Sequence, residues 1–356
     1  MSTKILDHKE NPALQPAYGL WQQYQPQNAP YAFRAKTLSE AQTWQTETRI
    51  ALAQTIGLRG DSNHPLQPQI IESVDKGDYV REKVLLQTSA HTQMPVYLLI
   101  PKQAEKPLPA VLAFHGHGYG VKDLVGLWED GQERDIPDGY HKDFAVELCR
   151  AGFFVAAPEI ACFGERQTDF SYLDPVLGQP IPSTCAHAAM LAFHIGASVL
   201  GMRIYDGMRL VDYLETRPEV DLKRLGAMGI SGGGMHTFFS TCLDERIRAC
   251  VVSGYFSTFR DSILAMAHCV CNFVPGLGQF GEIYDLVGLI APRPMLVESG
   301  SYDPIFPRKA VEQSIARAAK LYEVFGEQTL EADYFEGRHQ ISGKKAYTFL
   351  KKVLNN

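Results

Sequence analysis

The chain has 356 residues, of which 45% are hydrophobic, and a formal net charge of −6 at pH 7. That apolar fraction is enough for a large core, and the acidic balance excludes the basic surface typical of nucleic-acid-binding proteins. The first ten residues lack the apolar core of a signal peptide, and seven scattered cysteines are typical of reduced thiols. We therefore expect a cytoplasmic globular protein without a nucleic-acid partner.

The N-terminal part differs from the rest of the chain. Residues 12–30 are rich in Gln, Pro and aromatic side chains and predict an irregular arm. The apolar positions of residues 38–58 predict a helix, for which Ser39 is a candidate cap. We expect residues 1–75 to form an arm and helix packed on the chain's own core, although such an arm leaves a homo-oligomer open. Residues 76–356 should form the main domain.

From residue 79 onward, strands alternate with helices. The first two strands, 79–86 and 94–101, are close enough to form a hairpin. Further strands are expected at 109–114, 153–159, 224–229, 249–254, 293–300 and 330–337, and helices at 143–151, 203–215, 235–243, 309–322 and 343–354. This alternation predicts an α/β fold with a mostly parallel central sheet flanked by helices.

The longest apolar stretch is residues 188–202, which contains His194 and two glycines. It is too short and too interrupted to span a bilayer. We therefore expect a buried helix here and no membrane partner.

The sequence Gly229-Ile230-Ser231-Gly232-Gly233 stands between a predicted strand and a predicted helix. A Gly-x-Ser-x-Gly turn of this kind exposes the serine hydroxyl above a sheet, and its glycines let the strand and the helix approach each other. A glycine-rich turn with no catalytic role would give the same pattern, so the assignment depends on whether the partner residues of a catalytic serine are present. A catalytic serine here would be followed by an acid and then a histidine, each after a strand.

Both partners are present in that order. Asp303 follows the apolar strand 293–300, and His339 follows the strand 330–337. Taken alone, Asp303 could be a turn residue before a proline, and His339 an ordinary loop histidine. Three elements at the required strand ends instead predict a triad, in which His339 takes the proton of Ser231 and Asp303 orients the imidazole.

Such a triad also needs fixed amide groups for the developing negative charge. We expect one from Gly232, the residue after the serine, and the other from the loop that begins at His115, where His117 and Tyr119 are the candidates. Metal binding by the loop histidines is the alternative, but no cysteine or carboxylate stands within a few residues at a familiar ligand spacing. The cluster His268-Cys269-Val270-Cys271 would need a fourth ligand elsewhere. We expect no metal and no organic cofactor.

These residues together resemble the α/β-hydrolase superfamily. The order of Phe114-His115-Gly116-His117-Gly118, the serine turn, Asp303 and His339 carries the likeness. The chain is similar to the dienelactone-hydrolase-like and acetyl-xylan-esterase-like branch, and most of all to α/β hydrolase family 7. Shorter motifs support this: Pro158-Glu159, Phe163-Gly164-Glu165-Arg166, Arg217-Pro218-Glu219-Val220-Asp221, Val252-Ser253-Gly254-Tyr255, Phe259-Arg260-Asp261-Ser262-Ile263 and Ala291-Pro292-Arg293-Pro294.

The resemblance covers roughly residue 78 to the C-terminus and implies an α/β-hydrolase fold. Dienelactone hydrolases proper use a cysteine nucleophile, whereas this chain has Ser231, which favours a serine esterase. In this fold the segment 169–202 usually carries a cap, and it could wall a pocket together with the charged loop 121–141. The candidate pocket residues are His115, Trp128, Tyr172, His187 and His268.

We therefore expect a serine carboxylic-ester hydrolase that acts on small soluble esters, with acetylated sugars or short aryl and alkyl esters as the default substrates. Two alternatives stay open. One is a serine peptidase or amidase of the same fold. The other is a non-catalytic binding protein on a hydrolase scaffold, because fold alone does not fix function.

Overall fold

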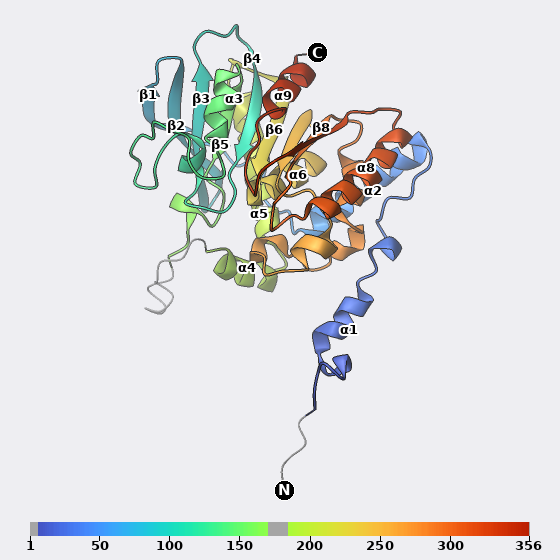
Figure 1. Ribbon diagram of the computed structural model, residues 1–356. Helices are drawn as coiled ribbons and strands as arrows, with labels where there is room; N and C mark the ends of the chain where they lie inside the picture. Colours follow the sequence, from blue (N-terminus) through green and yellow to red (C-terminus); the bar gives the residue numbers. More distant parts are fainter. Residues whose placement is uncertain (1–5, 170–183, 356) are drawn as a thin grey trace.

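The computed structural model describes residues 6–169 and 184–355. Within these residues the centre of the protein is one nine-stranded sheet with the order β1-β2-β3-β5-β4-β6-β7-β8-β9 (Figure 1). The first three strands are antiparallel, and β3 also pairs antiparallel with β5. They are β1 (Gln69–Asp75), β2 (Tyr79–Ser89) and β3 (Thr92–Pro101). The predicted hairpin is therefore confirmed as β2 and β3.

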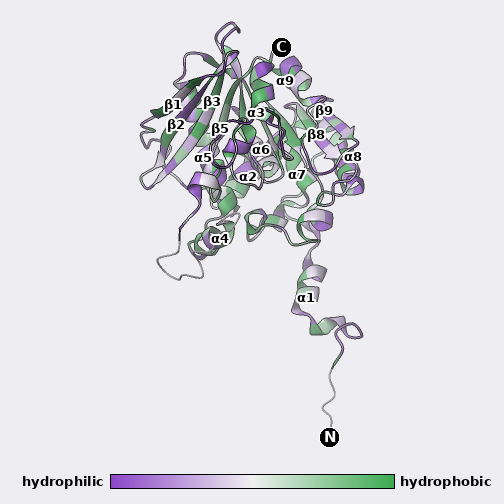
Figure 2. Ribbon diagram, turned by 60° about the vertical axis from the view of Figure 1, so that its left-hand side comes forward, coloured by the Kyte–Doolittle hydropathy of each residue, from purple (hydrophilic) through white to green (hydrophobic). Residues whose placement is uncertain are grey.

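The rest of the sheet is parallel. Every residue of β4, β5, β7 and β8 is buried, which is why these strands are continuous apolar runs in the sequence. The central strands are mostly hydrophobic in Figure 2. The parallel strands are β4 (Leu108–Phe114), β5 (Phe154–Pro158), β6 (Val220–Ile230), β7 (Ala249–Ser253), β8 (Met295–Gly300) and β9 (Leu330–Phe335).

Helices cover both faces of this sheet. One face packs against α3 (Phe144–Arg150) and α9 (Ala346–Leu354). The other face packs against a larger set: α2 (Leu38–Thr55), α5 (Val199–Glu215), α6 (Gly232–Leu243), α7 (Ile283–Leu286) and α8 (Arg308–Val324). The protein thus has the mostly parallel, helix-flanked α/β-hydrolase arrangement that the sequence predicts.

The sheet brings three distant parts of the sequence to one edge. Because β6, β8 and β9 are parallel, their carboxyl ends lie at the same side of the sheet. Ser231 follows β6 directly, Asp303 stands in the loop after β8, and His339 stands in the loop after β9. Residues separated by more than 100 positions in the chain are therefore neighbours in space.

The N-terminal arm divides into two parts. Its helix α1 (Pro16–Gln23) projects away from the sheet, and all of its residues are exposed (Figures 1 and 2). The part that follows packs on the body: the Tyr24 hydroxyl donates to Glu282 (2.9 Å), and the rings of Phe33 and Trp44 meet edge to face. The second part of the arm therefore packs on the body, and α1 meets the body near its end, where the Arg260 guanidinium lies 5.3 Å from the centre of the Trp21 ring.

Two details at the end of the arm differ from the sequence prediction. The cap of α2 is Thr37 rather than Ser39: the Thr37 hydroxyl accepts the Glu40 amide (3.3 Å), and the Glu40 carboxylate accepts the Thr37 amide (3.2 Å). This reciprocal pair satisfies two amides that the first helical turn leaves free. In addition, residues 69–75 pair with β2 as a strand, so the end of the expected arm belongs to the sheet.

Residues 188–202 are not the single buried helix that the sequence predicts. The helix α4 (Cys185–His194) ends before Gly196, whose φ of +71° favours glycine. Ser198 then caps α5, and the two helices meet at 97°. No single described helix is long and apolar enough to cross a membrane, although this bent pair reaches that length and composition jointly. Three apolar residues of the first part are exposed: Met190, Leu191 and Ile195.

Candidate active site

Ser231 occupies a strained turn between β6 and α6. Its backbone has φ 57° and ψ −121°, a combination that residues other than glycine rarely adopt and that clusters at functional sites. The glycines on either side are required by space. A Cβ on Gly229 would collide with the Gly233 carbonyl oxygen, and a Cβ on Gly233 would collide with the Phe114 carbonyl oxygen. The tight strand-to-helix turn predicted from the sequence is therefore present.

His339 is oriented by Asp303. The His339 Nδ1 atom is 2.7 Å from Asp303 Oδ2, and the other carboxylate oxygen, Oδ1, accepts the backbone amides of Ile305 (2.8 Å) and Phe306 (3.1 Å). Both oxygens of this buried carboxylate are thus occupied, which fixes its plane. On the opposite side of the ring, His339 Nε2 is buried and has no hydrogen-bond partner in the described part of the chain.

Neighbouring residues confine the His339 ring. Phe306 stacks on it with ring centroids 5.7 Å apart, and Tyr140 lies 5.4 Å away. Gly254 has φ +50°, and a Cβ at this position would lie 2.9 Å from His339 Cε1. The Tyr140 hydroxyl also donates to the carbonyl of His117 (2.6 Å), so one side chain contacts both the histidine and the loop after β4.

A buried acid, Glu298 of β8, connects the strand before Asp303 with the segment after His339. It accepts hydrogen bonds from the Ser253 hydroxyl of β7 (2.6 Å) and from the Gly343 amide (2.8 Å). Burial raises the pKa of this carboxyl to about 7, because desolvation disfavours its charged form. These bonds tie the segment beyond His339 to the sheet.

A cavity of about 310 Å³ opens above the serine turn. Ser231 and His339 both line it, together with residues of the segment 266–272 between β7 and β8. None of the described lining residues is Asp, Glu, Lys or Arg. The wall therefore offers apolar contacts and neutral hydrogen-bonding groups.

Two residues with unpaired backbone amides line this cavity beside the serine. Gly232 begins α6, and His117 belongs to the loop after β4. Among the described residues, neither amide donates to another group. Tyr119, the other candidate from the sequence, lines a separate cavity with Lys122. Of the two candidates, only His117 thus lines the cavity of Ser231.

The loop that carries His117 rests on a buried network that sequence reasoning missed. The Gly116 amide donates to His141 Nε2 (2.8 Å), and His141 Nδ1 is 2.7 Å from Asp123 Oδ2. Arg134 donates to the other oxygen of Asp123 (2.9 Å). Burial alone would raise the pKa of Asp123, but the bonds from His141 and Arg134 hold it at about 2. The only signal in the sequence was the charged composition of residues 121–141.

The predicted pocket residues lie in different environments. His268 lines the cavity. His115 is buried beneath the loop after β4, Trp128 is 43% exposed and packs against an arginine, and His187 lies on α4. None of these three belongs to the described wall of the cavity. His115 stands two residues before His117, but its Nε2 accepts the Ile160 amide (3.0 Å) instead. Tyr172 lies outside the described residues.

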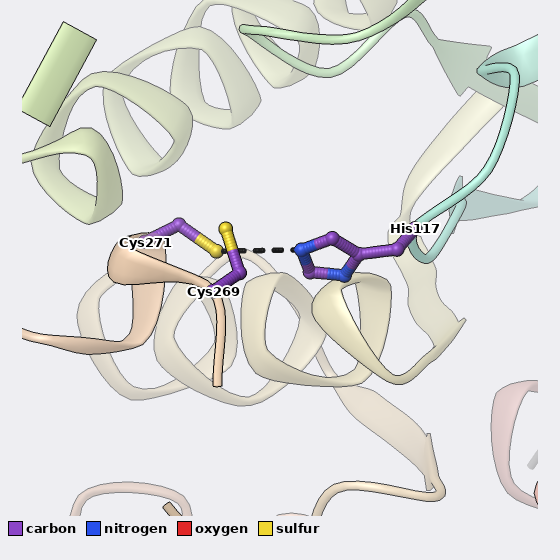
Figure 3. Close-up of side chains that lie close together, drawn as sticks. All are labelled: His117, Cys269 and Cys271. Carbon is purple, nitrogen blue, oxygen red and sulfur yellow. Dashed lines mark hydrogen bonds between the residues drawn. The ribbon is translucent and has the colours of Figure 1, made fainter. Parts of the chain in front are cut away.

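One group of side chains in the described residues has the spacing of metal ligands. His117 lies close to Cys269 and Cys271 (Figure 3). The expectation of no metal rested on the lack of further ligands near these residues in the sequence, and the fold brings together parts of the chain about 150 residues apart. Burial, followed by the charge of Arg203, lowers the pKa of His117 to about 4, so its imidazole is neutral at pH 7.

Comparison with known sequences decides the family. The family model Abhydrolase_7, described as an abhydrolase family, matches residues 14–334. The chain belongs to the abhydrolase family. This match confirms the resemblance to α/β hydrolase family 7, and it includes most of the N-terminal arm as well as the sheet.

Individual relatives of this abhydrolase are distant. A Bacillus subtilis protein named as a candidate hydrolase, YtaP, is 28% identical over 270 residues, which cover 73% of this chain and 83% of YtaP. A Bacteroides fragilis structure titled as a candidate acetyl xylan esterase has a TM-score of 0.73 at 17% identity and covers 94% of this chain and 89% of its own. A glucuronoyl esterase from Solibacter usitatus has a TM-score of 0.62 at 17% identity, with coverage of 93% and 100%. At such identities these structures show the shared fold.

Proposed function

We propose that the protein is a serine carboxylic-ester hydrolase that acts on small, neutral, soluble esters. Ser231 attacks the ester carbonyl while His339 Nε2 accepts its proton, and Asp303 keeps the other imidazole proton on Nδ1. The alcohol leaves with the proton from His339, and a water activated by the same histidine then releases the acyl group. The amides of Gly232 and His117 stabilise the oxyanion in both steps.

The observation that carries this proposal is the environment of His339 Nε2. This atom is buried beside the cavity of Ser231 and lacks a partner among the described residues, while Asp303 holds the opposite side of the ring. A buried polar atom without a partner is costly, and here it is oriented as a proton acceptor for a group in the cavity. The strained backbone of Ser231 supports the same assignment.

The substrate class follows from the size and the charge of the cavity. A volume of about 310 Å³ is at the lower end for ligand pockets, which favours a short acyl group. The described wall has no acidic residue to bind the free amine of a peptide, which favours an ester over a peptide substrate. Because relatives of this fold are named acetyl xylan and glucuronoyl esterases, carbohydrate esters are the first natural class to test.

A fluorophosphonate probe and a series of p-nitrophenyl esters test the proposal. We expect covalent labelling of Ser231, located by peptide mass spectrometry. We also expect kcat/KM for p-nitrophenyl acetate to exceed that for the octanoate by at least about tenfold, since the longer chain does not fit the cavity. Faster turnover of peptide p-nitroanilides would establish the amidase alternative. Absence of labelling and turnover in folded protein would establish the binding-protein alternative.

His141 is expected to position the loop after β4 rather than to contact substrate. Replacing it with alanine removes the acceptor of the Gly116 amide, so the neighbouring His117 amide loses its fixed place. We expect kcat for p-nitrophenyl acetate to fall by about 10-fold to 100-fold with little change in KM, because small displacements of catalytic groups have effects of this size.

Two further variants make this test specific. His141→Gln keeps an acceptor for the Gly116 amide and should recover part of kcat. His91→Ala changes an exposed histidine in the β2–β3 turn and should leave both constants unchanged. If His141→Ala retains full kcat, the network under the loop has no role in the reaction.

A further inference from the structure

His117, Cys269 and Cys271 bring three potential metal-binding atoms together at the edge of the cavity (Figure 3). Cys271 Sγ lies 3.8 Å from His117 Nε2, and the three ligand atoms all lie within 4.8 Å of one another. Cys269 stands just before the short helical turn Val270–Asn272, and Cys271 lies within it. The histidine comes from a separate loop, so the group joins two elements of the site.

The separation of 3.8 Å between Cys271 Sγ and His117 Nε2 is close to that around a zinc ion. With Zn–S bonds of about 2.3 Å and Zn–N bonds of about 2.0–2.1 Å, tetrahedral geometry places two sulfur ligands about 3.8 Å apart and sulfur and nitrogen about 3.5 Å apart. The cluster therefore needs only small side-chain movements to close around an ion. Imidazole and thiolate together are also ligand types that zinc prefers.

A fourth sulfur lies next to the cluster. The thiol of Cys185, the first residue of α4, lies next to the thiols of Cys162, Cys269 and Cys271. Its Sγ accepts a hydrogen bond from Arg203 Nη2 (3.2 Å). Cys185 thus lies outside the group of three but beside its two cysteines, and is the candidate fourth ligand.

The charge of Arg203 also requires an explanation. This side chain is 1% exposed, and its described hydrogen bonds go to the Ala161 carbonyl oxygen and to Cys185 rather than to a carboxylate. A buried cation without an anionic partner is unfavourable. A zinc ion bound by three thiolates and a neutral imidazole carries a net charge of −1, which would neutralise the guanidinium.

We propose that His117 Nε2 and the sulfurs of Cys269 and Cys271 bind one zinc ion beside the cavity, with the sulfur of Cys185 as the fourth ligand. Binding releases the protons of the three thiols to solvent, because the thiolate is the ligand. The ion fixes the His117 ring, whose Nδ1 lies on the side of Gly232: a Cβ on that glycine would be 3.1 Å away. It would thereby anchor the loop after β4 to the cavity wall.

Metal content and a cobalt spectrum test the site independently of any enzymatic activity. The full-length protein is purified under reducing conditions, supplied with zinc and separated from free metal. We expect one zinc per chain, and we expect cobalt to give an intense thiolate-to-metal charge-transfer band. Cys269→Ser and Cys271→Ser should each lose the zinc and the band, and Cys185→Ser should weaken both. Folding of every variant is checked by circular dichroism.

Cys149→Ser is the matched control, because Cys149 is a buried thiol of α3 on the opposite face of the sheet. It should bind zinc like the wild type. Wild-type protein that retains no zinc and shows no cobalt band overturns the proposal. Equal zinc in the control and in the Cys269 and Cys271 variants also overturns it, since the metal would then be bound elsewhere. An unchanged Cys185→Ser spectrum removes Cys185 from the ligand set. Zinc content and the cobalt spectrum report metal binding alone, so they test this site even if the esterase proposal fails.

Discussion

Replacing Ser231 with alanine is expected to lower kcat for p-nitrophenyl acetate by about a million-fold, the size of effect seen when a serine nucleophile is removed. Only the hydroxyl group is removed, and the space that it leaves at the turn is small. The oxyanion amides of Gly232 and His117 stay in place, so a residual rate above that of water should remain. Steady-state kinetics with active-site titration of the wild type measure the loss.

Ser240→Ala is the matched control for this change. Ser240 is a buried serine of α6, the helix that follows Ser231, and its hydroxyl has no hydrogen-bond partner among the described residues. The control should keep wild-type kcat and bind the fluorophosphonate. A Ser231→Ala variant that keeps more than about a tenth of wild-type kcat would contradict the proposed mechanism.

Asp303→Asn is expected to lower kcat by about 10⁴-fold through the tautomer of His339. The Ile305 and Phe306 amides already donate to Asp303 Oδ1, so the asparagine carbonyl oxygen must take that position. Its amide nitrogen then faces His339 Nδ1 and donates to it. The imidazole proton is driven to Nε2, which can no longer accept the proton of Ser231.

The melting temperature and the pH dependence of kcat distinguish this effect from a general loss of folded structure. The variant should keep the melting temperature within a few degrees, because the side chain has the same shape, and the lost rate should partly return at high pH as hydroxide replaces the missing base. Asp130→Asn, an exposed loop change, should leave kcat unaltered. Wild-type kcat in Asp303→Asn would show that Asp303 has no part in orienting the histidine.

The sheet and the order of the three proposed catalytic residues could be predicted because the signals for them lie within short stretches of the sequence. Buried parallel strands are continuous apolar runs, and Ser231 and Asp303 each follow such a run within a few residues. His339 follows β9, in which buried and more exposed residues are mixed. Once the strands are parallel, their carboxyl ends coincide and the residues meet. The glycines around Ser231 add a steric signature that does not depend on any distant contact.

The contacts that hold the loops of the site could not be predicted, because they join distant positions that share no sequence pattern. The bond between Gly116 and His141 depends on how the charged loop 121–141 folds back under the sheet edge. The approach of His117 to Cys271 depends on two loops about 150 residues apart. The break before α5 depended on one glycine and one serine, Gly196 and Ser198, inside an otherwise apolar stretch.

The cavity wall and the proposed reaction centre have separate origins in the chain. The three residues of the proposed triad follow three strand ends that the whole sheet holds in place, whereas much of the described wall comes from one short segment, residues 266–272. Substitutions in that segment can therefore change the selectivity among esters while Ser231, Asp303 and His339 keep their positions. A mutant library confined to residues 266–268, 270 and 272, which spares the proposed zinc ligands Cys269 and Cys271, would explore new acyl and alcohol preferences on an unchanged scaffold.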